Sequence, residues 1–183
     1  MTKIINLYGA PGSGKSTIAS GLFFHMKMAG LNVELATEYA KSKLFEENTY
    51  VFKDQLYCFS KQHKKLREMN GKVDYIITDS PLLMSLIYNS SEPELFNELV
   101  LQYYNMYDNI NFLLKRNHIY HTEGRLQTEQ ESDHVGEELE NYLEKYNIEY
   151  KTLPSNESMY NILQILYRSM GSYKINIFVF QKK

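Results

Sequence analysis

The feature that most constrains this chain is a glycine-rich stretch near its start, Gly9-Ala10-Pro11-Gly12-Ser13-Gly14-Lys15-Ser16-Thr17. It matches the pattern Gly-x-x-x-x-Gly-Lys-[Ser/Thr] at every position, and it follows the apolar run Ile4-Ile5-Asn6-Leu7-Tyr8. A buried strand, a loop and a helix are therefore expected in succession. Glycines let backbone N–H groups turn inward, and the first turn of the helix adds its own unpaired N–H groups. The stretch predicts a phosphate-binding loop (P-loop), with a chance glycine-rich turn as the alternative.

The side chains at the end of this loop have distinct expected roles. Lys15 is expected to reach the β- and γ-phosphates of ATP, and the Ser16 hydroxyl is expected to bind Mg²⁺. Thr17 can add a hydrogen bond to another phosphate oxygen. ATP and Mg²⁺ are therefore the expected cofactors.

Composition narrows the class of protein. A chain of 183 residues with 43% hydrophobic and 23% charged residues is expected to form one soluble domain across residues 1–183. Its net charge of −2 gives no overall positive field that would attract nucleic acid or membranes, although a local basic groove would suffice. The single cysteine, Cys58, cannot form an internal disulfide, which favours the cytoplasm (the host cytoplasm if a phage encodes the chain). Cys58 also lies in an apolar pattern and is expected to be a small buried hydrophobe.

Predicted strands and helices alternate along the chain. This order predicts a three-layer α/β fold of the P-loop NTPase type, with a mainly parallel five-stranded sheet and helices on both faces. The role of a further alternating segment, 175–180, is left open. The predicted strands are 3–8, 31–36, 73–79, 110–114 and 150–153, and the predicted helices are 15–29, a short one from 38, 52–70, 82–88, 93–107, 133–146 and 156–170.

Two carboxylates follow predicted strands at the edge where ligands of such folds gather. Asp79 ends the third strand and is expected to accept hydrogen bonds from Mg²⁺-bound water or from the P-loop hydroxyl. Its alternative role is a turn former before Pro81. Glu38 follows the second strand and is expected to accept the proton of an attacking hydroxyl or to bind a sugar hydroxyl. Alternatively, Glu38 is only a favourable negative charge in the first turn of a helix.

Two further segments are expected to complete the site. Arg116 and Arg125 flank a polar segment, about 116–132, that suits a lid closing cations onto the γ-phosphate. A solvated loop is the alternative. Gln55, Gln62 and Arg67 lie on the predicted helix 52–70, where they are expected to contact the acceptor. There Gln62 would read a base or amide edge and Arg67 would meet a phosphate, unless they simply face solvent.

These motifs resemble one known family. The P-loop with Thr37-Glu38-Tyr39-Ala40, the strand ending Thr78-Asp79-Ser80-Pro81, and Tyr107-Asp108 are similar to the NadR-type small P-loop kinases, from about Ile4 to Leu153. That family includes nicotinamide riboside kinase domains and phage proteins. Gly124-Arg125-Leu126-Gln127-Thr128-Glu129 is similar to the phage members, some of which look like kinases of hydroxymethyluracil in DNA.

The resemblance implies roles for individual residues. Lys15, Ser16, Asp79 and the lid arginines would serve the phosphates, Mg²⁺ and the transition state, and Glu38 would be the base. The expected activity is ATP- and Mg²⁺-dependent phosphorylation of a hydroxyl on a nucleoside-like acceptor. That acceptor is a modified base in phage DNA, a free nucleoside or nucleotide, or nicotinamide riboside. The chain has no tryptophan, which departs from the riboside kinases.

A different class, an ATPase or GTPase switch, is the functional alternative. No guanine-reading Asn-Lys-x-Asp pattern is present, and an arginine-bearing lid suits a kinase better than a switch. A P-loop module that binds nucleotide without turning it over is the third class, which the intact Lys15, Ser16 and Asp79 argue against.

Overall fold

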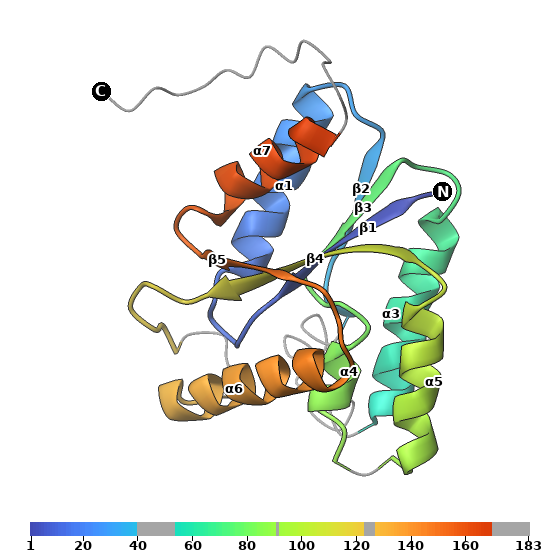
Figure 1. The fold of residues 1–183 in the computed structure, drawn as a ribbon, viewed down its shortest axis with the longest axis vertical. Helices are drawn as coiled ribbons and strands as arrows, with labels where there is room; N and C mark the ends of the chain where they lie inside the picture. The colour runs from blue at the N-terminus through green and yellow to red at the C-terminus, as the bar shows by residue number, and fades with distance from the viewer. Residues whose placement is uncertain (40–53, 91, 123–126, 170–183) are drawn as a thin grey trace.

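The computed structural model describes residues 1–39, 54–90, 92–122 and 127–169, and its ribbon is drawn in Figure 1. Within these ranges five strands form one sheet in the order β2-β3-β1-β4-β5, and every neighbouring pair is parallel. The predicted parallel α/β fold is confirmed. The strands are β1 (Lys3–Tyr8), β2 (Val33–Ala36), β3 (Tyr75–Thr78), β4 (Asp108–Lys115) and β5 (Lys151–Pro154).

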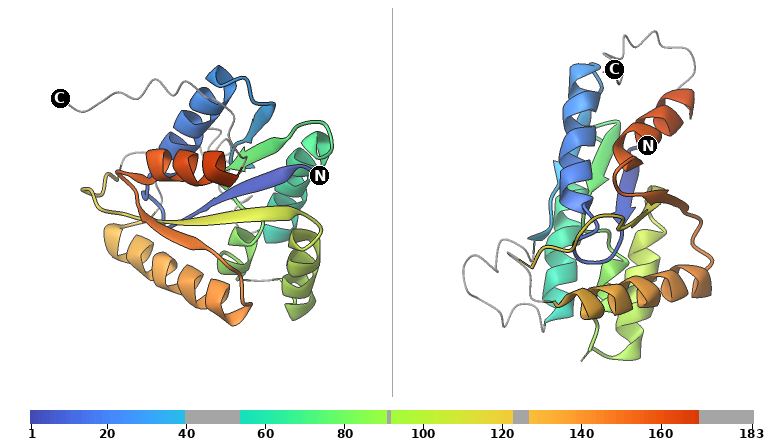
Figure 2. Two further views of the ribbon diagram at one scale, coloured as in Figure 1. Left: turned by 45° about the horizontal axis from the view of Figure 1, so that its top comes forward. Right: turned by 90° about the vertical axis from the view of Figure 1, so that its left-hand side faces the viewer.

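Helices cover both faces of this sheet (Figure 2). One face packs against α1 (Lys15–Met28) and α7 (Ser158–Ser169). The other face packs against α3 (Gln55–Met69), α4 (Met84–Ile87), α5 (Glu94–Tyr104) and α6 (Glu129–Lys145).

Within the described ranges, no helix has the length and apolar character needed to cross a membrane.

The central strand β1 is buried on both sides, as its mostly apolar sequence predicts. Ile4 and Tyr8 face one core cluster, whereas Ile5 and Leu7 face the other, and all four are fully buried. Asn6 is the polar exception. Its amide donates to the side-chain oxygens of two asparagines on β4, so burial leaves it satisfied.

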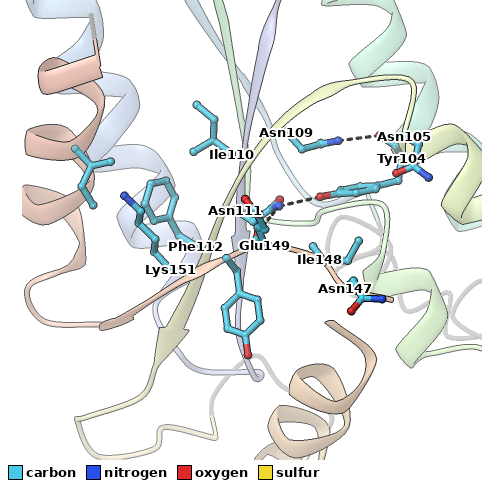
Figure 3. Close-up of a pocket in the computed structure, with 12 residues that line it drawn as sticks. Tyr104, Asn105, Asn109, Ile110, Asn111, Phe112, Asn147, Ile148, Glu149 and Lys151 are labelled. Atoms are coloured by element: carbon cyan, nitrogen blue, oxygen red, sulfur yellow. Dashed lines mark hydrogen bonds between the residues drawn. The ribbon is translucent and has the colours of Figure 1, made fainter. Parts of the chain in front are cut away.

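The asparagines on β4 extend this polar ladder to the sheet edge (Figure 3). The Asn111 amide donates to the Tyr104 hydroxyl and to the Glu149 carbonyl, both at 2.8 Å. These groups line an open crevice of about 650 Å³ along the amino-terminal half of β4. The P-loop lies at the opposite, carboxyl edge of the sheet, so this crevice is separate from the predicted nucleotide site.

The main correction to the predicted elements concerns α6. It begins at Glu129, four residues before the predicted start, because Thr128 and Glu131 form a capping box. The Thr128 hydroxyl accepts from the Glu131 N–H at 3.3 Å, and the Glu131 carboxylate accepts from the Thr128 N–H at 2.7 Å. The last residues of the predicted lid, 116–132, are therefore helical. The predicted strand 175–180 lies outside the described residues, as does most of the helix predicted from residue 38.

Candidate active site

The P-loop connects β1 to α1 and needs glycine for its shape. Gly9 has φ 150°, and a Cβ there would lie 2.4 Å from Ser13 Oγ and 2.7 Å from the Leu114 carbonyl oxygen. Gly14 caps α1 in the left-handed conformation, with φ 86°. The motif glycines therefore hold a backbone path that an L side chain would obstruct.

The polar groups of this loop suit a polyphosphate. The Lys15 ammonium folds over the loop and donates to the carbonyls of Gly9 at 2.7 Å and Ala10 at 3.0 Å. The Ser13 hydroxyl is fully buried, and within the described residues it has no hydrogen-bond partner. A buried hydroxyl without a partner is costly, which is consistent with a group that serves a bound phosphate oxygen. The loop and the N-terminus of α1 thus form an anion cradle.

Helix α6 packs directly on the P-loop, which the sequence motifs did not indicate. The fully buried Ser132 donates its hydroxyl to the Pro11 carbonyl at 2.6 Å. One turn later, a Cβ on Gly136 would lie 3.4 Å from the Cβ of Ala10. Two small residues four positions apart on a helix rich in charged residues are the sequence signal that would have indicated this contact.

The two residues that supply the predicted carboxylates, Glu38 and Asp79, lie side by side at the edge of the sheet that carries the P-loop. Asn6 pairs with Thr78 across β1 and β3, so Asp79 lies near the carboxyl end of β1, where the P-loop begins. Asp79 is 4% exposed, and its Oδ1 accepts from the backbone N–H of Glu38 at 2.9 Å. Residues 41 positions apart are therefore joined at the carboxyl edge of the sheet, as the strand pattern predicted.

Gln62 has a different environment from the one expected. It is 5% exposed, its Oε1 accepts from the Tyr39 N–H at 3.2 Å, and its Nε2 donates to the Thr78 hydroxyl at 3.2 Å. Both polar ends of the amide contact the protein, so the prediction that Gln62 reads a base edge is corrected. Neither expected role of Gln62, contact with the acceptor or exposure to solvent, includes these partners. Lys65, one turn later, donates to the Thr37 carbonyl at 2.7 Å.

The other predicted acceptor residues lie at opposite ends of α3. Gln55 begins the helix and is 6% exposed. Arg67 lies in its last turn, after which the Gly71 N–H donates to the Thr2 hydroxyl, just before β1 begins. Arg67 is therefore displaced toward the amino edge of the sheet, away from the P-loop, and the structure does not bring it to the site.

Of the two predicted lid arginines, Arg116 is described and Arg125 lies outside the described residues. Arg116 follows β4 and is 11% exposed. Its guanidinium pairs with Asp133 and, at 3.2 Å, with Glu129, both on α6, and it lies 4.8 Å from the centroid of the Tyr120 ring. Its Nη1 is buried and has no hydrogen-bond partner within the described residues. Arg116 thus anchors the segment after β4 to α6.

The loop after β5, which the sequence motifs did not indicate, joins the start of the predicted lid beside the P-loop. The Asn117 side-chain oxygen accepts from the Ser155 hydroxyl at 2.7 Å and from the Asn156 N–H at 3.2 Å. Ser155 and His118 both lie 3.9 Å from the Cβ position of Gly14. These two loops therefore flank the N-terminus of α1.

Known structures share this fold. The thymidylate kinase from Ehrlichia chaffeensis has a TM-score of 0.61 and 15% identity, and the match covers 91% of this chain and 99% of that one. Two structures of a deoxyadenosine kinase from M. mycoides have TM-scores of 0.53 and 0.52 at 18% identity, covering 93% and 92% of this chain and all of theirs. These likenesses show the fold alone. No curated protein matches the sequence. The sequence matches the AAA domain family over residues 4–159, which include the P-loop and both carboxylates, and the chain therefore belongs to the AAA domain family.

Proposed function

We propose that this protein is a kinase that transfers the γ-phosphoryl group of ATP to a hydroxyl of a nucleoside-like acceptor. The observation that carries the proposal is the pair of joined residues, Glu38 and Asp79, beside the P-loop. A P-loop alone binds nucleotide, whereas a kinase also needs a group that accepts the proton of the attacking hydroxyl. Solved proteins of similar fold are named as a thymidylate kinase and a deoxyadenosine kinase, which supports an acceptor of the nucleoside class.

The nucleotide would occupy the cradle described above. Its phosphates would contact the inward N–H groups of the loop and the N-terminus of α1, with Lys15 exchanging its carbonyl partners for phosphate oxygens. The loops around Asn117 and Ser155 flank the same helix end, so they are suited to hold the nucleoside half of ATP.

The residues present also fit Mg²⁺. Ser16 is the second residue of α1, and Asp79 follows β3 at the same edge of the sheet, so this edge carries both a hydroxyl and a carboxylate. Mg²⁺ prefers oxygen ligands and is held in kinases by one or two protein groups together with phosphate oxygens. When bound, it would neutralise the charge that develops on the phosphate oxygens.

Glu38 would act on the acceptor. Its carboxylate would take the proton of the acceptor hydroxyl while that oxygen forms a bond to the γ-phosphorus. The bond from the γ-phosphorus to the β–γ bridging oxygen breaks, and ADP leaves. Lys15 would stabilise the charge on the transferred group throughout. Arg116 can stabilise the same charge only if its guanidinium leaves Glu129 and Asp133 on α6 and binds the phosphate instead.

The cations on α3 favour a small acceptor over a base within DNA. Lys61 lies over the Tyr57 ring, Lys64 pairs with Glu68, and Lys65 donates to a backbone carbonyl. Because these cations have separate partners, they do not form one continuous stripe that would follow a phosphate backbone. We therefore place a free nucleoside or nucleotide ahead of hydroxymethyluracil in DNA and of nicotinamide riboside.

The test is transfer of the γ-phosphate from labelled ATP, with Mg²⁺, to two acceptor pools. One pool holds nucleosides, nucleotides and nicotinamide riboside, and the other holds duplex DNA with and without hydroxymethyluracil. Label on a free nucleoside or nucleotide supports the proposal. Label on the modified DNA alone would show that the acceptor is a base within DNA and not a small molecule. ATP hydrolysis at the same rate without any acceptor would instead indicate a switch, and absence of turnover in both pools would indicate a binding module.

A further inference from the structure

We infer that Gln62 and Lys65 are positioning residues that hold the turn Thr37–Tyr39, and with it the carboxylate of Glu38, at the carboxyl edge of the sheet. The catalytic meaning of this clamp rests on the proposed kinase function. The clamp itself consists of hydrogen bonds between α3, the end of β3 and the turn. These hydrogen bonds can be tested without an acceptor.

Three successive residues of the turn each have one backbone group held by a side chain. Two of these side chains come from α3 and the third from the residue after β3. In order, the Thr37 carbonyl accepts from Lys65 Nζ at 2.7 Å, the Glu38 N–H donates to Asp79 Oδ1 at 2.9 Å, and the Tyr39 N–H donates to Gln62 Oε1 at 3.2 Å.

The turn needs these partners because strand pairing has ended. Ala36 is the last residue of β2 and pairs with Thr78, so the ladder supplies no further bonds for the residues that follow. Backbone groups beyond a ladder need other partners, and here side chains supply them for the half-buried Glu38 and Tyr39 and for the exposed Thr37. Gln62 is suited to this task because an amide carries both a donor and an acceptor.

The far end of Gln62 is itself fixed. Its Nε2 donates to the Thr78 hydroxyl, which is fully buried and also accepts from the Ser80 N–H at 3.2 Å. The amide therefore bridges β3 and the turn after β2 through two bonds in a buried site. Because Gln62 is itself buried, loss of one bond would leave a polar atom without a partner, which makes the bridge stiff.

Lys65 adds charge to the same place. Its partial burial lowers the pKa of the ammonium, while the nearby carboxylates of Asp79 and Glu38 raise it. Lys65 therefore lies close enough to Asp79 and Glu38 to interact with the charge of both carboxylates. The clamp thus fixes the turn that carries Glu38 and places a cation near its carboxylate.

Gln62→Met is the first variant, because methionine has a similar length and cannot form either bond. We expect kcat for the acceptor to fall by about 10-fold or more, since a shift of the base by about 1 Å costs up to about 100-fold in rate. The dissociation constant for ATP should stay at the wild-type value. Glu68→Met, on the exposed side of the same helix, is the matched control and should keep wild-type kcat.

Thr78 gives a second, independent variant. Thr78→Val removes the hydroxyl that holds the far end of Gln62 and should lower kcat in the same way, whereas Thr78→Ser should restore it. The double variant of Gln62→Met and Thr78→Val should lose little beyond Gln62→Met alone, because both changes break the same bridge. If the kcat losses of the two single variants instead add up in the double variant, the bridge between Gln62 and Thr78 is overturned.

Amide hydrogen exchange followed by NMR measures the clamp without any acceptor. Gln62→Met should raise the exchange rate of the Tyr39 amide by about 10-fold or more and leave the Ile5 amide in β1 unchanged. Unchanged exchange at Tyr39 would overturn the clamp, and faster exchange with wild-type kcat would overturn its positioning role. If exchange rises but wild-type protein phosphorylates no acceptor, the clamp stands and the kinase proposal fails.

Discussion

Substitution of Gly9 by alanine should destabilise this protein strongly, because two separate effects act at that position. The backbone there has φ 150°, which an L side chain rarely adopts, and such strain costs about 1–3 kcal/mol. The new methyl group would also lie 2.7 Å from the Leu114 carbonyl oxygen. That oxygen belongs to the backbone of β4 and cannot rotate away, so overpacking adds about 1–3 kcal/mol.

Two other glycines separate these effects. Gly30 and Gly71 have φ 78° and 80°, but an added Cβ at either position would have nothing within 4 Å. Their alanine variants should therefore show backbone strain without a steric clash. We expect Gly9→Ala to lose about 2–6 kcal/mol of unfolding free energy. Each control should lose about 1–2 kcal/mol, the cost of a left-handed backbone alone.

Urea denaturation followed by circular dichroism measures the unfolding free energy of the three variants. Titration of the folded variants with ATP measures how tightly the P-loop binds the nucleotide. Gly9→Ala should also weaken ATP binding, because its methyl group displaces the loop that faces the phosphates. A Gly9→Ala variant that is no less stable than Gly30→Ala would refute the argument, since the clash with Leu114 would then have no energetic consequence.

Further predictions address the site. Lys15→Ala should abolish phosphoryl transfer, measured with labelled ATP, because the cation over the loop is lost; wild-type transfer would contradict the P-loop mechanism. Glu38→Gln should leave the ATP dissociation constant unchanged and slow transfer by about 100-fold or more, whereas an unchanged rate would assign Glu38 to the turn alone. Gly136→Val should weaken ATP binding in calorimetry, because its added carbons would push α6 away from Ala10; equal affinity would exclude coupling between α6 and the loop. Cys58 is only partly buried, and not the fully buried hydrophobe expected from the sequence. This partial burial, with smaller contributions from the carboxylates of Asp54 and Glu38, raises the pKa of the Cys58 thiol to about 11. Iodoacetamide at pH 8 should therefore alkylate it about 100-fold more slowly than an ordinary thiol, and a rate like that of a model thiol would contradict this.

Local patterns were sufficient for much of the fold and part of the site. The motif Gly9–Thr17 predicted the strand, loop and helix at their observed places, because glycine spacing and an apolar run act over a few residues. The spacing of Gln55, Phe59, Gln62 and Leu66 is local and helical in the same way, and all four are buried on one face of α3. The carboxylates Glu38 and Asp79 could be expected at one edge because parallel strands present their carboxyl ends together. Their roles in phosphoryl transfer stay predictions.

What the tertiary structure alone decided are the partners of the polar side chains. A glutamine on the inward face of a helix has the same periodicity whether it faces a substrate or the protein, and only the packing of α3 against β3 assigned both ends of Gln62. Arg116 reads in sequence as a lid cation, yet α6 supplies it with two carboxylates. The contact between Ser132 and Pro11 joins residues 121 positions apart. Sequence patterns therefore determined the elements, whose causes are local, whereas the pairing of distant polar groups depended on how the elements pack.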